Sequence, residues 1–118
     1  MIQIIPKEHL MNYPCSVVAV ASALNLKDKD IEIPEKLKSD GYLTLEEMNK
    51  YIRKNLKVKK KEYFKRTERK TLTKLFDQND KKAIVCLLGH YVYIDSMEYY
   101  SFFNKDDDLV VCIWWLAI

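Results

Sequence analysis

Glycine, proline and long apolar runs are all scarce in this chain of 118 residues, which contains only two glycines and three prolines. Such a composition leaves little room for flexible linkers, and no segment is repeated, so we expect one domain over residues 1–118. No apolar run is long enough to cross a membrane, and the first six residues lack the charged start and apolar stretch of a signal peptide. The sequence therefore indicates a single domain that is not expected to associate with a membrane.

Cysteine is also sparse. The chain has three cysteines, an odd number, and neither a CxxC pair nor the ligand spacing of a zinc finger. This usage is typical of a reducing cytoplasm and not of a disulfide scaffold, so a cytoplasmic protein is expected. For the same reason we expect neither a metal site nor a cofactor.

Apolar residues make up 48% of the chain and aromatic residues 12%, which excludes a disordered tail. Residues 14–26 are apolar nearly all the way round, which predicts a buried central helix. Thr44, followed three residues later by Glu47, predicts a capped amphipathic helix over 44–56. From Ala83 onwards the period changes to that of strands, in the runs 83–88, 90–95, 99–103 and 109–116. We therefore predict an α+β fold in which the buried N-terminal helix packs against an antiparallel C-terminal sheet.

Cys15 is the candidate nucleophile. It falls in the first turn of the expected central helix, where unpaired N–H groups and the positive end of the helix dipole favour a thiolate. A thiol hydrolase also needs an imidazole that is near in space but distant in sequence, and His90 opens a predicted strand directly after Gly89. The other two cysteines, Cys86 and Cys112, lie in apolar strands and are expected in the core.

A third polar side chain must orient the imidazole. If Asp95 pairs with Tyr99 across a three-residue turn, His90 lies opposite Asn104 in the next strand. Asn104 is therefore the first choice as orienting group, Asp106 the second and Asp95 the third.

An oxyanion formed during acyl transfer needs two donors. The backbone N–H of Cys15 would supply one of them. Asn12 or His9 would supply the other, and the sequence does not choose between the two.

Three segments in this order, residues 12–19, 89–94 and 99–104, followed by a final aromatic strand, resemble a papain-like cysteine peptidase of the small bacterial and phage type. The resemblance lies in the helix-capping cysteine, the strand that opens on Gly-His and the second strand that ends in Asn or Asp. It implies that Cys15 is the nucleophile, His90 the general base and acid, and Asn104 the orienting residue. It also implies a peptide or protein substrate, so we expect a small thiol hydrolase, either a peptidase or an amidase.

Basic residues are concentrated in residues 53–70, which contain ten lysines and arginines against two glutamates. The preferred interpretation is a solvated edge strand that its lysines protect from further pairing. Lysines and an aromatic ring are also the groups that bind single-stranded nucleic acid, and here they are Lys59, Lys60, Lys61 and Tyr63. The alternative function is therefore an inactive domain of the same fold that binds protein or nucleic acid through residues 53–70.

Overall fold

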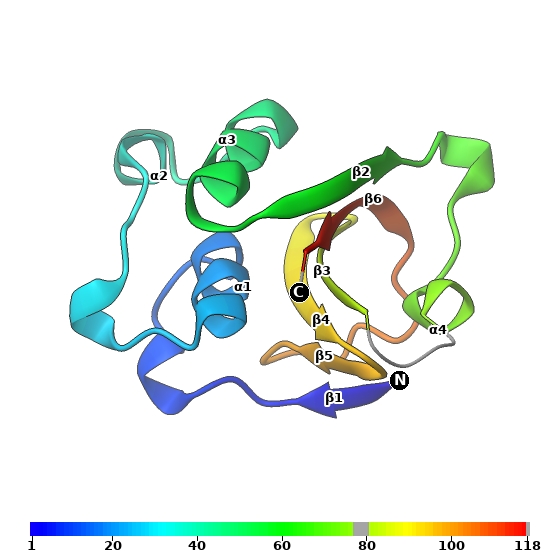
Figure 1. Cartoon of the computed structure of the whole chain (residues 1–118), viewed down its shortest axis with the longest axis horizontal. Helices are drawn as coiled ribbons and strands as arrows, with labels where there is room; N and C mark the ends of the chain where they lie inside the picture. Colours follow the sequence, from blue (N-terminus) through cyan, green and yellow to red (C-terminus); the bar gives the residue numbers. More distant parts are fainter. Residues whose placement is uncertain (77–80, 118) are drawn as a thin grey trace.

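A computed structural model describes residues 1–76 and 81–117 and shows a curved six-stranded sheet with helices on both faces (Figure 1). Along the sheet the strands follow the order β1-β5-β4-β3-β6-β2, and β1 and β5 are its only parallel neighbours. The strand bounds are Ile2–Ile4 (β1), Val58–Tyr63 (β2), Lys82–Leu87 (β3), His90–Asp95 (β4), Glu98–Tyr100 (β5) and Val110–Leu116 (β6). The mixture of helices with a mostly antiparallel sheet confirms the α+β prediction.

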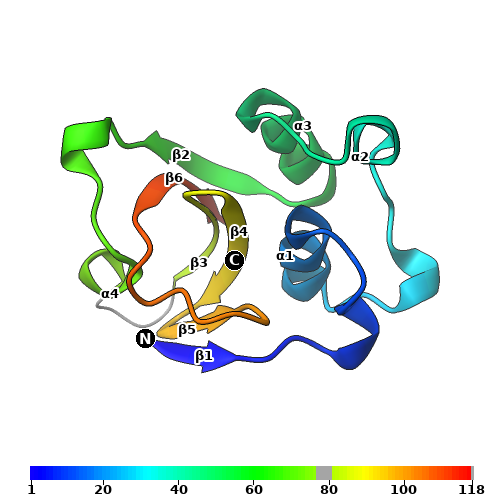
Figure 2. The ribbon, with the colours of Figure 1, turned by 180° about the vertical axis from the view of Figure 1, so that it is seen from behind.

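The four α-helices of the described residues divide between the two faces of the sheet. Figures 1 and 2 show one group on the convex face of the sheet and the other on its concave face. On the convex side lie α1 (Cys15–Leu24), α2 (Glu35–Asp40) and α3 (Leu45–Asn55), and on the concave side lies α4 (Leu72–Leu75). Short 3₁₀ turns occupy Glu8–Leu10, Asp28–Asp30 and Arg66–Glu68.

The central helix α1 begins at Cys15 because Pro14 fixes an extended backbone at its N-cap, with φ −58° and ψ 151°. It ends where Asn25 adopts a left-handed conformation, with φ 55°. Val17, Ala19 and Val20 are almost completely buried between the sheet and α3. The predicted buried central helix is thus present, with its last turn shorter than expected.

Helix α3 starts with the predicted capping box. The Thr44 hydroxyl accepts from the Glu47 N–H at 3.2 Å, and the Thr44 N–H donates to the Glu47 carboxylate at 3.0 Å. Further along, the Trp114 indole N–H of β6 donates to Asn49 Oδ1 at 2.9 Å. This bond ties the helix to the sheet across the cluster of apolar side chains on the convex face.

Side chains alternate across the sheet, so each central strand supplies both cores. In β3, Ile84 and Cys86 face α1 and α3, whereas Ala83 and Val85 face α4. The concave core is closed by Leu72 and Phe76, both fully buried. The sequence predicts a short helix here, starting at Thr71 or Thr73 with Leu72, Leu75 and Phe76 inward, and α4 forms with Leu72 and Phe76 buried and Leu75 partly buried. The turn that the sequence predicts at 77–80 lies outside the described residues.

Strand β2 lies at the edge of the sheet, as predicted, and pairs with β6 alone. The predicted pairing of Asp95 with Tyr99 is wrong by one residue: Asp95 pairs with Glu98, across a two-residue turn in which Ser96 has φ 60°. Over the described residues, no helix has the length and apolar character needed to span a membrane.

Candidate active site

Cys15 is the first residue of α1, and its side chain is partly exposed. The first hydrogen bond within the helix runs from the Val18 N–H to the Pro14 carbonyl at 2.9 Å. The N–H groups of the first turn, including that of Cys15, therefore have no partner within the helix. Of the residues that carry these donors, Cys15 and Ser16 line a hollow beside the thiol.

His90 is the first residue of β4, and a tight hairpin places it there. Leu87 and His90 pair across a two-residue turn, and Gly89 takes a left-handed φ of 73°, which glycine adopts without the strain of a side chain. The ring of His90 meets Phe103 edge-on, with centroids 6.0 Å apart. On the same side, its Nε2 lies 3.2 Å from the Ser101 hydroxyl.

Cys15 and His90 line the same two hollows. The small hollow, about 110 Å³, is bounded by Met11, Val18 and Phe103 together with the two candidate residues. The wide hollow, about 400 Å³, lies between the start of α1, the α2–α3 connection and the turn before β4. Within residues 1–76 and 81–117, no hydrogen bond joins the thiol to the imidazole or occupies His90 Nδ1. The thiol thus lies in a cleft that it shares with one imidazole.

Burial and, to a smaller extent, the positive charge of Lys105 lower the pKa of His90 from 6.5 to about 4. Asp108, which is 3.4 Å from the Lys105 ammonium, acts against this shift. At neutral pH the ring is therefore uncharged and can accept a proton. It would take that proton from the thiol during attack on a substrate and would not hold it beforehand.

The other two thiols are unsuited to chemistry. Cys86 is buried opposite Cys112 in neighbouring strands. Burial raises the pKa of Cys86 to about 12 and also raises the pKa of Cys112. Both thiols therefore lie in the core, as the sequence predicts, and their raised pKa values disfavour the reactive thiolate.

Ser101, which was not predicted from the sequence, is the residue that forms a hydrogen bond with the candidate base. Its hydroxyl also accepts from the Phe103 N–H at 3.1 Å, so one proton and one lone pair remain for His90 Nε2. The hydroxyl can therefore donate to Nε2 when that nitrogen carries no proton, or accept from it when it does. One signal for it was present in the sequence: Ser101 is the one small polar residue between the aromatic pairs at 99–100 and 102–103.

Asn104, the first choice for the orienting group, is exposed and lies elsewhere. Its Oδ1 accepts from the Tyr99 hydroxyl at 3.4 Å and from the Asp106 N–H at 3.0 Å. Asp106 itself is exposed, and Asp95 lies at the opposite end of β4 from His90. The structure therefore brings none of the three candidates to the hydrogen bond at His90 Nε2, where Ser101 stands.

The two proposed oxyanion donors also lie apart from the thiol. His9 Nε2 is 3.1 Å from the Leu26 carbonyl, which joins the turn before α1 to the end of that helix. Asn12 is exposed. Neither residue is among the described lining of the two hollows at Cys15, so the first-turn N–H groups of α1 are the donors that the structure places there.

The four basic-stretch residues are divided between the two faces of β2. A bulge between Val58 and Lys60 sets this division. The Lys61 ammonium lies 5.6 Å from the centre of the Trp114 ring, and the Tyr63 hydroxyl accepts from Arg69 at 3.3 Å. Lys59 and Lys60 instead line a separate hollow of about 400 Å³, which we call the lysine hollow, together with Glu62, Lys81, Lys82 and Trp115.

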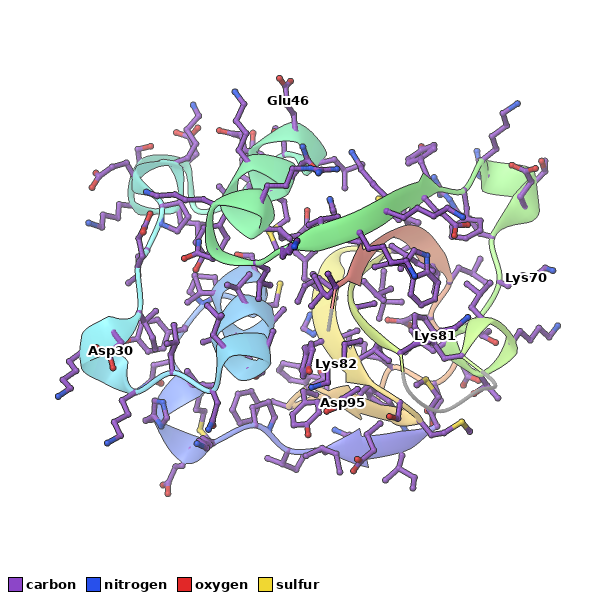
Figure 3. The ribbon with its side chains drawn as sticks, viewed as in Figure 1. Asp30, Glu46, Lys70, Lys81, Lys82 and Asp95 are labelled. Atoms are coloured by element: carbon purple, nitrogen blue, oxygen red, sulfur yellow. The ribbon has the colours of Figure 1, made fainter. Side chains whose placement is uncertain are left out.

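Figure 3 shows Lys82, the first residue of β3, close to Asp95, its partner in β4, and Lys81, the residue before it, further toward α4. In the lysine hollow, the Lys81 ammonium lies 5.1 Å from the centre of the Trp115 ring. The Trp115 indole N–H donates to Glu62 at 2.8 Å, and Lys60 pairs with the same carboxylate at 3.1 Å. Among the described residues that line this hollow, one carboxylate thus accompanies four ammonium groups.

No group of three histidine, cysteine or acidic side chains in the described ranges is arranged to hold a metal ion. Comparison with known proteins found no family model, no curated protein and no solved structure that matches the chain. The function is therefore inferred from the geometry of the site.

Proposed function

We propose that the protein is a small thiol hydrolase that cleaves a peptide or amide bond, and that its thiol and imidazole have the same roles as in a papain-like peptidase. The observation that supports this proposal is that the thiol at the start of α1 and the imidazole at the start of β4 line the same two hollows. A location in a reducing compartment such as the cytoplasm belongs to the proposal, because all three cysteines are free.

In the proposed reaction, the Cys15 sulfur attacks the substrate carbonyl carbon while its proton passes to His90. The first-turn N–H groups of α1 receive the negative oxygen. As the carbon–nitrogen bond breaks, the leaving amine takes the proton from His90. Water then attacks the thioester, gives a proton to His90 and releases the acid, after which the proton returns to sulfur.

Ser101 takes, in this proposal, the orienting role that the resemblance assigned to Asn104. Its hydroxyl holds Nε2 and leaves Nδ1 as the nitrogen for the thiol. As an acceptor, it would stabilise the imidazolium that forms during attack. It does so more weakly than a carboxylate because it carries no charge.

Alkylation with iodoacetamide at pH 6 tests the proposal. Selectivity for Cys15 alone would follow from the burial of Cys86 and Cys112, so the dependence on His90 is the decisive readout. We expect His90→Ala to slow alkylation of Cys15 by about tenfold or more, as loss of a general base does. Lys74→Ala, an exposed change on the opposite face of the sheet, is the control and should leave the rate unchanged. Equal rates in the wild type and His90→Ala would refute the hydrolase.

The lysine hollow favours a second candidate function, the binding of single-stranded nucleic acid. Among its described residues four ammonium groups outnumber one carboxylate, and the Trp115 ring offers a flat surface on which a base can stack once Lys81 moves aside. An acidic peptide would use the charges but not the ring.

Titration of the protein with a fluorescent oligothymidine at several salt concentrations tests this second function. We expect an affinity that falls with salt and drops by about tenfold in Lys81→Glu. Lys50→Glu makes the same charge change on an exposed position of α3 and should have a smaller effect. An equal effect of the two changes would indicate general charge attraction and exclude a site at the lysine hollow.

A further inference from the structure

The two hollows that flank Cys15 contain no formally charged side chain among their described residues. This is unusual in a chain with 20 lysines and arginines and 17 aspartates and glutamates. The nearest cation named at the site, Lys105, lies against the Phe103 ring and pairs with Asp108 at 3.4 Å. A charged substrate group that entered either hollow would lose water and find no opposite charge in return.

Exposed apolar side chains gather at the same place. Met11, Tyr42 and Phe103 are 60%, 64% and 63% exposed, and all three line one of the hollows beside the thiol. Met11 and Phe103 belong to the small hollow, and Tyr42 belongs to the wide one. Large exposed apolar groups around a cleft are typical of a surface that a ligand covers.

The walls of the wide hollow are also apolar. Leu37, Leu43 and Leu45 come from α2, the connection after it and the start of α3. The small hollow has aromatic and aliphatic walls and about a quarter of the volume, about 110 against about 400 Å³. The two sides of the thiol therefore differ in size but share their lack of charge.

We propose that the substrate is a peptide whose residues on both sides of the cleaved bond are uncharged and apolar, with the smaller side chain in the small hollow and the larger one in the wide hollow. This inference rests on the proposed thiol hydrolase, whose scissile bond would lie between the two hollows. Tyr42 is a specificity determinant in it, because its ring would be covered by the larger side chain.

Peptide binding to Cys15→Ser tests the inference without requiring a reactive thiol. Two capped hexapeptides are compared by calorimetry, one with alanine and phenylalanine at the two central positions and one with glutamate at both. We expect the apolar peptide to bind at least tenfold more tightly, and Tyr42→Glu to remove most of that difference. Tyr63→Glu makes the same change at a tyrosine 57% exposed on β2 and should leave the preference intact.

Equal affinity for the two peptides, failure of both to bind, or the same effect from Tyr42→Glu and Tyr63→Glu would overturn the inference. The alkylation experiment separates this failure from failure of the hydrolase. If Cys15 alkylation depends on His90 but the two peptides bind equally well, the thiol hydrolase proposal stands and the apolar substrate class is wrong. If the apolar peptide binds more tightly but Cys15 alkylation does not depend on His90, the cleft binds apolar peptides and the proposed catalysis is wrong.

Discussion

The imidazole of His90 is held by contacts that also keep it uncharged. Its ring is half-buried against Phe103, and the Lys105 ammonium lies 5.8 Å from the centre of that Phe103 ring. A base that is neutral at neutral pH can accept the thiol proton, but it cannot stabilise a thiolate in advance. The candidate site thus favours proton transfer during attack over a resting ion pair.

Lys105→Gln should raise the pKa of His90 from about 4 towards 6.5, because it removes the cation that disfavours the imidazolium. Burial, the larger cause, stays, so the rise should be partial. Proton NMR of the ring C–H signals against pH measures it, and His9 serves as the internal reference in the same spectra. An unchanged His90 titration would show that Lys105 does not influence the ring.

Ser101→Ala removes the hydroxyl at His90 Nε2 and leaves the ring free to turn about its side-chain bonds. We expect the alkylation rate of Cys15 to fall by about three- to tenfold while the protein stays folded, since one hydrogen bond is lost and little volume. Ser101→Asn, which offers a carbonyl acceptor, should recover part of the rate. A purely structural role would lower stability and leave the rate per folded molecule unchanged.

At the scale of elements, local signals in the sequence predicted more than non-local ones. The capping box at Thr44 and the apolar run after Pro14 act within a few residues, and both helices form as expected. The strand register was missed because the turn at Ser96 is one residue shorter than assumed, and because β5 ends at Tyr100, opposite Tyr93, before it reaches His90. A bulge in β2 likewise could not be read from the lysines themselves. The parallel pairing of β1 with β5 joins the two ends of the chain and has no local signal at all.

Asn49→Ala should destabilise the packing of α3 against β6. It leaves the indole N–H of Trp114, a residue buried completely, without its acceptor at 2.9 Å. The expected loss in the free energy of unfolding is about 1–3 kcal/mol, measured by urea denaturation. Lys50→Ala, the adjacent exposed position, is the control and should change the free energy of unfolding by less than about 0.5 kcal/mol. Equal losses in the two variants would show that the bond does not hold the helix.

For the whole molecule, the depressed pKa of His90 makes stability depend on pH. Between pH 4 and 6.5 His90 is protonated in the unfolded chain but neutral in the folded protein. The free energy of unfolding therefore rises as pH rises through this window. The half-buried ring limits the effect to about 2 kcal/mol. Carboxylates with lowered pKa, such as Glu62, act at lower pH and remain in any His90 variant.

His90→Gln should therefore flatten the stability curve between pH 4 and 6.5 relative to the wild type. Urea denaturation at half-unit steps of pH measures both curves. Parallel curves would mean that the imidazole titrates in the folded protein as it does in the unfolded chain, which would contradict the burial and the charge described for it.

The direct test of the account is capture of the acyl group on Cys15. The protein is mixed with an activated apolar ester, quenched in acid within seconds, and digested, and the peptide that contains Cys15 is weighed by mass spectrometry. We predict an acyl adduct on Cys15 in the wild type that forms at least about tenfold faster than in His90→Ala. Acylation at the same rate in both proteins, or adducts spread over lysines with none on Cys15, would contradict the pairing of this thiol with this imidazole.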